Sequence, residues 1–482
     1  MPRRDCNKAT TIHKSMNIQA GQEVSLDIEK PVLGGHGLGR LNGMAVFVEG
    51  SLPGQRVQAR ITALKPRHAW AEPLEILEQS PDFTPPGCPH FGLCGGCDWL
   101  HMRYDQQLFW KRELVGETLR HLGQAEVEVA ATIPSPITDG YRNKMEFAFA
   151  PPAADAAGQA STAPFVLGLR PCGQAMRAVA VDSCRLCPTE MIHVRQVVEQ
   201  WAVNSGLAAY DPETGQGFWR HLVLRTGHPS AGMLAVLITA PHARASSIGQ
   251  KLAEHMQAHA PQVYSLVHAT RKSRTLFAQG ERTVFTLGAG RTTHHLDSLK
   301  LVVSSQSFFQ SNTPAAKEIY AVARDFAALS DRETLWDLYS GVGGIALSLA
   351  GQAGRVLGLE NVPSAVRDAK ANARRNKLAQ CRFVAGDAVE IMDQLEHEDT
   401  TKFDPARPDV IVADPPRGGM SPKVIAKLLS IKAPKLILVS CNPATQARDI
   451  KLLSPEYTVN RVQPVDMFPH TSHIECVAEL VA

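Results

Sequence analysis

The chain has 482 residues, a formal net charge of +3, 44% hydrophobic residues and 20% charged residues. Its length exceeds one ordinary domain and its composition excludes an intrinsically disordered protein, so we expect two or three globular domains. No apolar run approaches the roughly 20 residues that cross a bilayer, and the N-terminal segment contains no apolar core of a secretory signal. We therefore expect a cytoplasmic protein, and its slight positive charge is compatible with a nucleic-acid partner.

Short strands separated by glycine and proline occupy residues 16–78. The segments 24–28, 44–48 and 56–61 alternate apolar with polar side chains, which is the period of a half-buried strand. About five such strands without helices predict a small closed β-barrel.

Residues 79–298 combine a helical pattern with further strands. Apolar residues at helical spacing over 106–122 predict a helix, which is a candidate to pack on the C-terminal domain. After residue 141 the strand patterns return, and one predicted helix near 188–205 interrupts them. We expect a mainly antiparallel β domain, with an Ala/Pro/Gly/Ser-rich flexible insertion at 151–164.

From 299 to 482, apolar strands alternate with helical segments, which predicts an α/β doubly wound parallel sheet with its ligand at the carboxyl ends of the strands. The first strand runs into a glycine turn that ends at Gly344, and the second ends at Glu360, whose carboxylate can accept hydrogen bonds from ribose hydroxyls. This pattern also fits a dinucleotide fingerprint, so a methyl donor and NAD are both open here. Asp387, after the third strand, either binds an adenine amino group or caps a helix.

Reactive side chains follow the fourth and fifth strands, at Asp414 and at Cys441. A cysteine at a strand tip followed by Asn-Pro is exposed, although a lone cysteine is more often a small buried hydrophobe. Methylation of uracil at C5 needs such a thiol, because adding a thiolate to C6 gives C5 the carbanion character to attack a sulfonium methyl group. A base must then remove the C5 proton, and the chemistry alone leaves three candidates, namely His470, His473 and Glu475.

A cysteine-rich loop supplies Cys88, Cys94 and Cys97 as possible ligands of one centre. A fourth thiolate must come from elsewhere, and Cys184 and Cys187 are the obvious donors. Four thiolates suit either zinc or an iron–sulfur cluster. The spacing slightly favours iron, while a zinc-ribbon-like pairing of the two CxxC segments is the alternative.

Several motifs together resemble one enzyme family. They are CPHFGLCGGC, YRNKMEF, SFFQSN, DLYSGVGG, DPPRGG, SCNPAT and DMFPHTSHIE, and the N-terminal barrel is similar to a TRAM (OB-like) domain. Over nearly its whole length the chain resembles the iron–sulfur bacterial 23S rRNA (uracil-5-)-methyltransferases of the RNA m5U methyltransferase family. The resemblance implies S-adenosylmethionine as methyl donor, a [4Fe–4S] cluster in the central domain, and structured RNA, 23S rRNA before tRNA, as partner.

The resemblance also implies roles for single residues. Cys441 is the implied nucleophile and Glu475 the implied base, and the implied cluster ligands are Cys88, Cys94, Cys97 and Cys187, which leaves Cys184 outside. Contacts to the methyl donor fall on Gln310, Tyr339, Gly344, Glu360, Asp387 and Asp414.

The chain departs from the family pattern in the glycine turn. Tyr339 and Ser340 stand where the family often has cysteine or phenylalanine, and Gly344 stands where asparagine is common. At Gly344 a backbone contact is therefore expected without a side-chain contact. An NAD-dependent oxidoreductase with an iron–sulfur centre is the alternative function, and tRNA is the alternative substrate.

Overall fold

The protein was analysed as a computed structural model that describes residues 18–154, 158–159, 162–228, 232–397 and 407–482. It divides into two compact units, residues 1–84 and 85–482. Among the described residues, no helix has both the length and the apolar character needed to cross a membrane.

The first unit contains the predicted barrel. Its strands are β1 (Glu23–Pro31), β2 (Gly37–Leu41), β3 (Met44–Val48), β4 (Arg56–Leu64) and β5 (His68–Glu78), closed in the order β1-β2-β3-β5-β4. Alternate side chains of β1 point into the barrel, with Val24, Leu26 and Ile28 buried between exposed neighbours. This period-2 pattern fixes which face of each strand forms the core. The predicted N-terminal β-barrel is confirmed, while its predicted bounds, 16–78, stay a prediction, and residues 16 and 17 lie outside the described residues.

The second unit begins with a six-stranded sheet of order β11-β10-β9-β8-β6-β7. The pair β9/β10 is parallel and the other neighbours are antiparallel, which agrees with the prediction of a mainly antiparallel β domain. The strands are β6 (Lys144–Ala150), β7 (Val166–Gly168), β8 (Trp219–Thr226), β9 (Met233–Thr239), β10 (Val263–Thr270) and β11 (Arg282–Leu287). Residues 155–157 and 160–161 of the predicted insertion lie outside the described residues.

The prediction of one helix in this region was wrong. In addition to α2 (Thr189–Asn204), a second helix, α3, spans Ala245–His259 and packs on the same core. Its Gly249 lowers helix propensity, which hides the helix in the sequence. The glycine is needed there because a Cβ at this position would lie 2.9 Å from the His268 ring.

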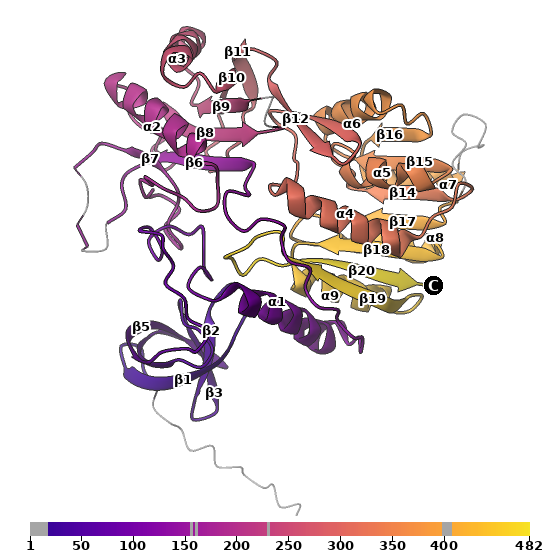
Figure 1. The fold of residues 1–482 in the computed structure, drawn as a ribbon, viewed down its shortest axis with the longest axis horizontal. Coiled ribbons are helices and arrows are strands. Elements are labelled where there is room, and N and C mark those ends of the chain that lie inside the picture. The colour runs from indigo at the N-terminus through magenta and orange to yellow at the C-terminus, as the bar shows by residue number, and fades with distance from the viewer. Residues whose placement is uncertain (1–17, 155–157, 160–161, 229–231, 398–406) are drawn as a thin grey trace, which may run out of the picture. The chain divides into compact units, whose positions relative to one another are not determined.

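A hairpin of β12 (Arg291–Leu296) and β13 (Leu299–Ser304) leads to the seven-stranded sheet, of order β16-β15-β14-β17-β18-β20-β19. Helices cover both of its faces, as Figure 1 shows, which confirms the doubly wound prediction. Its strands are β14 (Thr334–Leu338), β15 (Arg355–Glu360), β16 (Cys381–Ala385), β17 (Val410–Ala413), β18 (Lys435–Ser440), β19 (Thr458–Val465) and β20 (Glu475–Val481). Its helices are α4 (Thr313–Ala327), α5 (Gly344–Leu349), α6 (Pro363–Arg375), α7 (Ala388–His397), α8 (Pro422–Ile431) and α9 (Pro443–Leu453).

The strand β20 runs antiparallel to β18 and inserts between β18 and β19. The first five strands of the order are parallel, so their carboxyl ends meet at one edge of the sheet. Because β20 runs the other way, its N-terminal residue comes to that same edge.

The helix predicted over 106–122 is α1, Tyr104–Thr118, which continues as one π-helical turn, Leu119–Gly123. The helix α1 lies against strand β19 of the seven-stranded sheet and against helix α9, which packs on that sheet. At Gly123 a Cβ would lie 3.4 Å from Ala447 of α9, so the π-helical turn packs in van der Waals contact with α9. The predicted border between residues 298 and 299 falls inside the second unit and stays a prediction.

Candidate active site

Two carboxylates hold the glycine turn after β14. Gly341 N donates to Glu360 Oε2 (3.0 Å), and Ala346 N donates to the buried Asp337 Oδ2 (3.0 Å). Tyr339 has a φ of +64°, and Gly341 and Gly343 are also left-handed. A tyrosine in this region is strained, and such strain is concentrated at functional sites.

Gly344 leaves no room for a side chain. A Cβ at this position would lie 2.6 Å from the Tyr320 hydroxyl of α4. The turn therefore offers only its backbone here, as the absence of the family's asparagine predicts.

Glu360 and Asp387 both accept hydrogen bonds from backbone amides. Glu360 Oε1 accepts from Val362 N (2.8 Å). Asp387 Oδ1 accepts from Val389 N (2.9 Å) and Glu390 N (3.3 Å), so the helix-capping alternative is present in the structure. A contact from Asp387 to adenine stays a prediction.

Gln310 reaches the tip of β17 from the segment before α4. Its Nε2 donates to Asp414 Oδ2 (3.4 Å), and its carbonyl accepts from Asn143 Nδ2 (2.8 Å). Burial raises the pKa of Asp414 to about 7. A glutamine in a loop carries no sequence signal of its own, which is why only the family resemblance pointed to it.

The register of the sheet brings Cys441 and Glu475 together. Ser440 pairs with Cys476 across β18 and β20, so the next residues, Cys441 and Glu475, oppose one another at the ligand edge. Glu475 is 3% exposed, and its Oε2 has no hydrogen-bond partner among the described residues. A buried carboxylate oxygen without a partner is costly and requires an explanation.

The four ionisable groups at this edge act on one another. Burial, followed by the Glu475 carboxylate, raises the pKa of Cys441 to about 11, while the Arg417 guanidinium lowers it. Burial and the nearby Asp414 raise the pKa of Glu475 well above its usual range. The thiol is half-buried, so it is not a residue of the hydrophobic interior.

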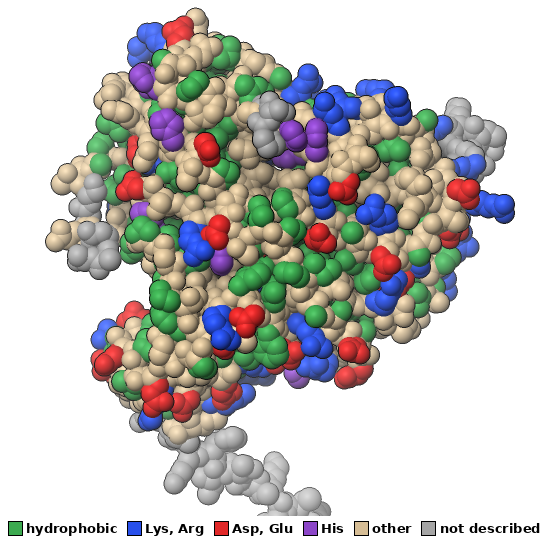
Figure 2. Space-filling view, viewed as in Figure 1, with side chains coloured by type: hydrophobic (Ala, Val, Ile, Leu, Met, Phe, Trp, Pro, Cys, Tyr) green, Lys and Arg blue, Asp and Glu red, His purple; other side chains and the backbone are tan. Residues whose placement is uncertain are grey.

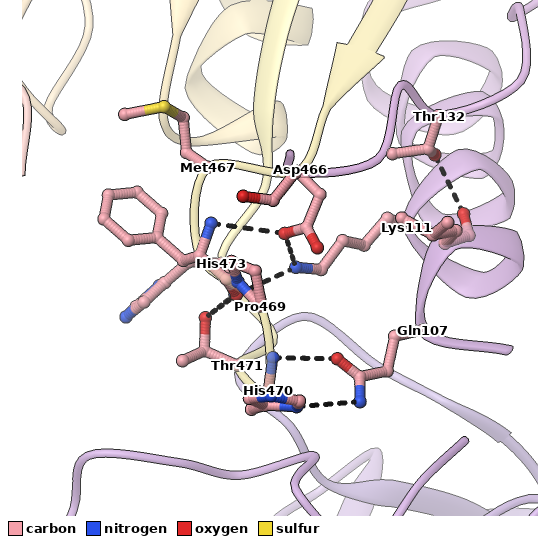
Figure 3. Close-up of polar contacts among 12 residues, drawn as sticks. Gln107, Lys111, Thr132, Asp466, Met467, Pro469, His470, Thr471 and His473 are labelled. Carbon is pink, nitrogen blue, oxygen red and sulfur yellow. Dashed lines mark hydrogen bonds and ion pairs between the residues drawn. The ribbon is translucent and has the colours of Figure 1, made fainter. Parts of the chain in front are cut away.

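The two histidines of the preceding segment contact groups other than the Cys441 thiol, and the partner of His473 is Arg417, which also acts on Cys441. The Nη2 atom of Arg417 lies 3.1 Å from His473 Nδ1. Burial and the positive charge of Arg417 lower the pKa of His473 to about 4. His470 lies beside Gln107 of α1, to which its backbone N donates (2.8 Å), as Figure 3 shows. Only Glu475 of the three candidate bases acts strongly on the Cys441 thiol.

Tyr320 lies beside the glycine turn at Gly344, and the sequence analysis did not point to it. Burial and the carboxylates of Asp414, Asp337 and Glu475 raise its pKa. On an amphipathic helix, a tyrosine on the apolar face is expected to be part of the hydrophobic core. No sequence signal therefore distinguishes Tyr320 from an ordinary core residue.

The segment 466–473, which leads into β20, is fixed by α1. Lys111 Nζ binds Asp466 Oδ1 (2.6 Å) and donates to Phe468 O (3.1 Å), and Figure 3 shows both contacts beside Gln107 and His470. Asn312 Nδ2 also donates to Met467 O (3.0 Å). Glu475 is therefore preceded by a segment held at several points.

Comparisons with known proteins identify the family to which this chain belongs. A family model described as tRNA (Uracil-5-)-methyltransferase matches residues 289–481, and a TRAM domain model matches residues 19–74. A relative from Nitratidesulfovibrio vulgaris, described as an uncharacterized RNA methyltransferase, is 38% identical over 95% of this chain and 96% of its own length. The chain belongs to the RNA (uracil-5-)-methyltransferase family. It is therefore an S-adenosylmethionine-dependent RNA methyltransferase with a TRAM domain, and the NAD-dependent oxidoreductase alternative is wrong.

Further relatives and a solved structure extend this result. An uncharacterized RNA methyltransferase of Chlorobaculum tepidum is 35% identical over 90% of this chain and 91% of its own length. The Pyrococcus abyssi tRNA (uracil-54, C5)-methyltransferase in complex with S-adenosyl-L-homocysteine has a TM-score of 0.72 at 24% identity, covering 95% of this chain and 99% of that one. At this identity the likeness shows a shared fold.

The cysteines predicted as cluster ligands lie in one neighbourhood. Burial, followed by Cys184 and Cys88, raises the pKa of Cys94, and the largely buried Arg142 lowers it. Cys184 also acts on Cys97, and it forms a hydrogen bond with Cys187. Over the described residues, no group of three or more Cys, His, Asp or Glu side chains has a geometry that could hold a metal ion.

Proposed function

We propose that this RNA methyltransferase transfers a methyl group to C5 of a uridine in 23S rRNA, through a covalent bond between Cys441 and C6 of the base. The observation that carries the proposal is the opposition of the Cys441 thiol and the unpartnered Glu475 carboxylate at the edge that holds the glycine turn. The predicted cytoplasmic location is part of the same proposal.

The reaction balances with these two groups. The Cys441 thiolate uses its electron pair to form a bond to C6, and the electron pair of the C5–C6 double bond moves into an enolate. C5 of this enolate attacks the methyl group, which breaks the methyl–sulfur bond and releases S-adenosylhomocysteine. Glu475 takes the proton from C5, the C5–C6 double bond re-forms and the thiolate is eliminated. Burial and the Glu475 carboxylate raise the pKa of Cys441 to about 11, which disfavours the thiolate. The Arg417 guanidinium lowers this pKa, so Arg417 is the cation that favours the thiolate.

The methyl donor would lie along the glycine turn. The backbone of Gly344 and the strained Tyr339 would face it, and Glu360 would bind the ribose hydroxyls. Gln310, Asp387 and Asp414 complete the proposed contacts. The hydrogen bond between Gln310 and Asp414 supports the proposed donor site, because it brings two of these residues together in the absence of a ligand.

We also propose that Cys88, Cys94, Cys97 and Cys187 hold a [4Fe–4S] cluster. The support is the gathering of these thiols with Cys184 around the positive charge of Arg142, together with the family resemblance. Bound, the cluster would cross-link the loop 88–97 to the segment 184–187, since methyl transfer needs no electron.

A covalent trap tests the proposed function. RNA containing 5-fluorouridine cannot release a C5 proton, so incubation with S-adenosylmethionine should leave wild-type protein bound to RNA under denaturing conditions. Cys441→Ala should give no adduct, and an equal yield from both proteins would refute the nucleophile. Comparing 23S rRNA with tRNA transcripts as acceptors decides between the two substrates, and mapping 5-methyluridine in a deletion strain locates the position.

A further inference from the structure

Three hollows adjoin one another on the surface of the second unit. The first, of about 570 Å³, is lined by Thr313 and Lys317 of α4 among others. The second, of about 480 Å³, shares Lys317 with the first, and the third, of about 620 Å³, shares Lys377 with the second. Because neighbouring hollows share lining residues, the three lie side by side from α4 to α6 and the edge strand β16, and together they are called the track.

The track begins beside the proposed methyl-donor site. Asn143, which lines the first hollow, donates from Nδ2 to Gln310 O (2.8 Å) and to Thr313 Oγ1 (2.8 Å). The same hollow is lined by His228 and His295, whose rings are stacked with centroids 4.2 Å apart. Aromatic rings of this kind are surfaces on which unpaired RNA bases stack.

The far end of the track is positively charged. The third hollow is lined by Lys370, Arg374, Lys377 and Arg382 and by no carboxylate. None of these four side chains makes an ion pair with another residue that the structure describes. Figure 2 shows Lys and Arg side chains gathered over α6, on the face that it displays.

The acidic groups along the track do not cancel this charge. Asp297, which lines the second hollow, is paired with Lys317 (3.2 Å), and Glu318 lines the first hollow. Asp368 of α6 accepts from Ser304 and Ser307 and is therefore directed toward β13. A solvated helix face usually intersperses charges of both signs, and the third hollow does not.

We propose that this track binds the phosphates of the RNA strand that flanks the target uridine. The inference rests on the proposed function, because the strand would leave the catalytic edge past Gln310 and follow the cations to β16. A groove that ends in unpaired cations and has an aromatic stack at its other end is the arrangement that binds single-stranded nucleic acid without reading its sequence.

A neutralised variant and a matched control test the track. The track variant is K370Q/R374Q/R382Q, and the control, R332Q/K423Q/K451Q, removes the same charge from exposed positions outside the hollows. The probes are oligouridylates of about 10 and about 30 nucleotides, with dissociation constants measured over a range of salt concentrations in the presence of S-adenosylhomocysteine.

The wild type and the control should bind the longer oligomer at least about tenfold more tightly than the shorter one, and the track variant should lose this preference. Its plot of log affinity against log salt should also flatten by about 2, because each lost single-strand phosphate contact removes about 0.7. A track variant with the length preference and salt slope of the control would overturn the proposal.

A failure of the track proposal can be distinguished from a failure of the proposed function. Methyl transfer to total RNA from a deletion strain reports on the active site, and a wild type without this activity would refute the function whatever the oligomers show. Given an active wild type, we expect the track variant to raise KM at an unchanged kcat. A KM equal to that of the control would refute the track alone.

Discussion

Lys111 and Asp466 form an ion pair of 2.6 Å in which both side chains are wholly excluded from solvent. The pair joins α1 to the segment that leads into β20, and Lys111 also donates to Phe468 O. His470, in the same segment, has a φ of +69° and is held by Gln107. These contacts determine where β20 begins, and therefore where Glu475 lies.

Removing one partner of this pair should be costly. Lys111→Met leaves the Asp466 carboxylate buried without its counter-charge, and we expect a loss of about 3 to 5 kcal/mol in the free energy of unfolding. Urea unfolding of the full chain measures it. The double variant K111M/D466N should recover part of the loss, whereas a K111M variant as stable as the wild type would show that the pair is not needed.

Gly344 should tolerate no side chain while Tyr320 keeps its hydroxyl. A Cβ at this position would lie 2.6 Å from the Tyr320 hydroxyl oxygen, so Gly344→Ala must displace α4 or the turn. We expect the affinity for S-adenosylhomocysteine, measured by calorimetry, to fall by roughly tenfold, or about 1.4 kcal/mol. Tyr320→Phe in the same chain should restore part of it, and no difference between G344A and G344A/Y320F would refute this contact.

Asp414 should make the ligand-free protein less stable as the pH rises. Burial raises its folded-state pKa to about 7, above the unfolded value, so its contribution to stability is complete in acid and is lost as the pH rises through 7. Asp414→Asn removes this dependence. At pH 8 the variant should melt at least about 2 °C above the wild type, and the difference should vanish toward pH 4. A variant that is less stable at pH 8 would reverse the sign and contradict the burial effect.

The secondary structure and the residues at strand ends could be predicted from local sequence patterns. Period-2 strands identify the barrel, and the alternation of strands and helices identifies the doubly wound sheet. Cys441 and Asp414 are predictable because parallel strands present their carboxyl ends at one edge, so strand tips point to a site without further information.

Long-range relationships are what the sequence hides. Lys111 and Asp466 are 355 residues apart, and nothing in either neighbourhood predicts a buried pair. Glu475 opposes Cys441 only because β20 inserts antiparallel beside β18, a topology that no local pattern encodes. Three candidate bases therefore stayed open on chemistry alone, and α3 was missed because the glycine that its packing requires weakens its helical pattern.

The proposed cluster predicts which cysteine supplies the fourth ligand. Purified wild-type protein should be brown and contain iron and sulfide. Cys187→Ser should lose both and Cys184→Ser should keep them, although Cys184 is the thiol that acts on Cys94 and Cys97 in the structure. If Cys184→Ser lost iron and sulfide while Cys187→Ser kept them, Cys184 would be the fourth ligand in place of Cys187. A colourless protein with stoichiometric zinc would refute the iron–sulfur assignment.

Glu475→Gln should separate the two halves of the reaction. The amide that replaces the carboxylate in this variant cannot accept the C5 proton, whereas thiolate addition and methyl transfer do not use that group. With ordinary RNA and S-adenosylmethionine, the variant should therefore form one equivalent of S-adenosylhomocysteine and then stop as a methylated protein–RNA adduct.

Turnover of the variant should fall at least about 100-fold, as expected for loss of a general base. Denaturing gel electrophoresis and mass spectrometry of the adduct measure the trapped species, which the wild type should not accumulate. The double variant C441A/E475Q controls for non-specific cross-linking and should give no adduct. If E475Q instead turned over at the wild-type rate, the proton would have to leave C5 by another group, and the buried carboxylate beside Cys441 would have no role in catalysis.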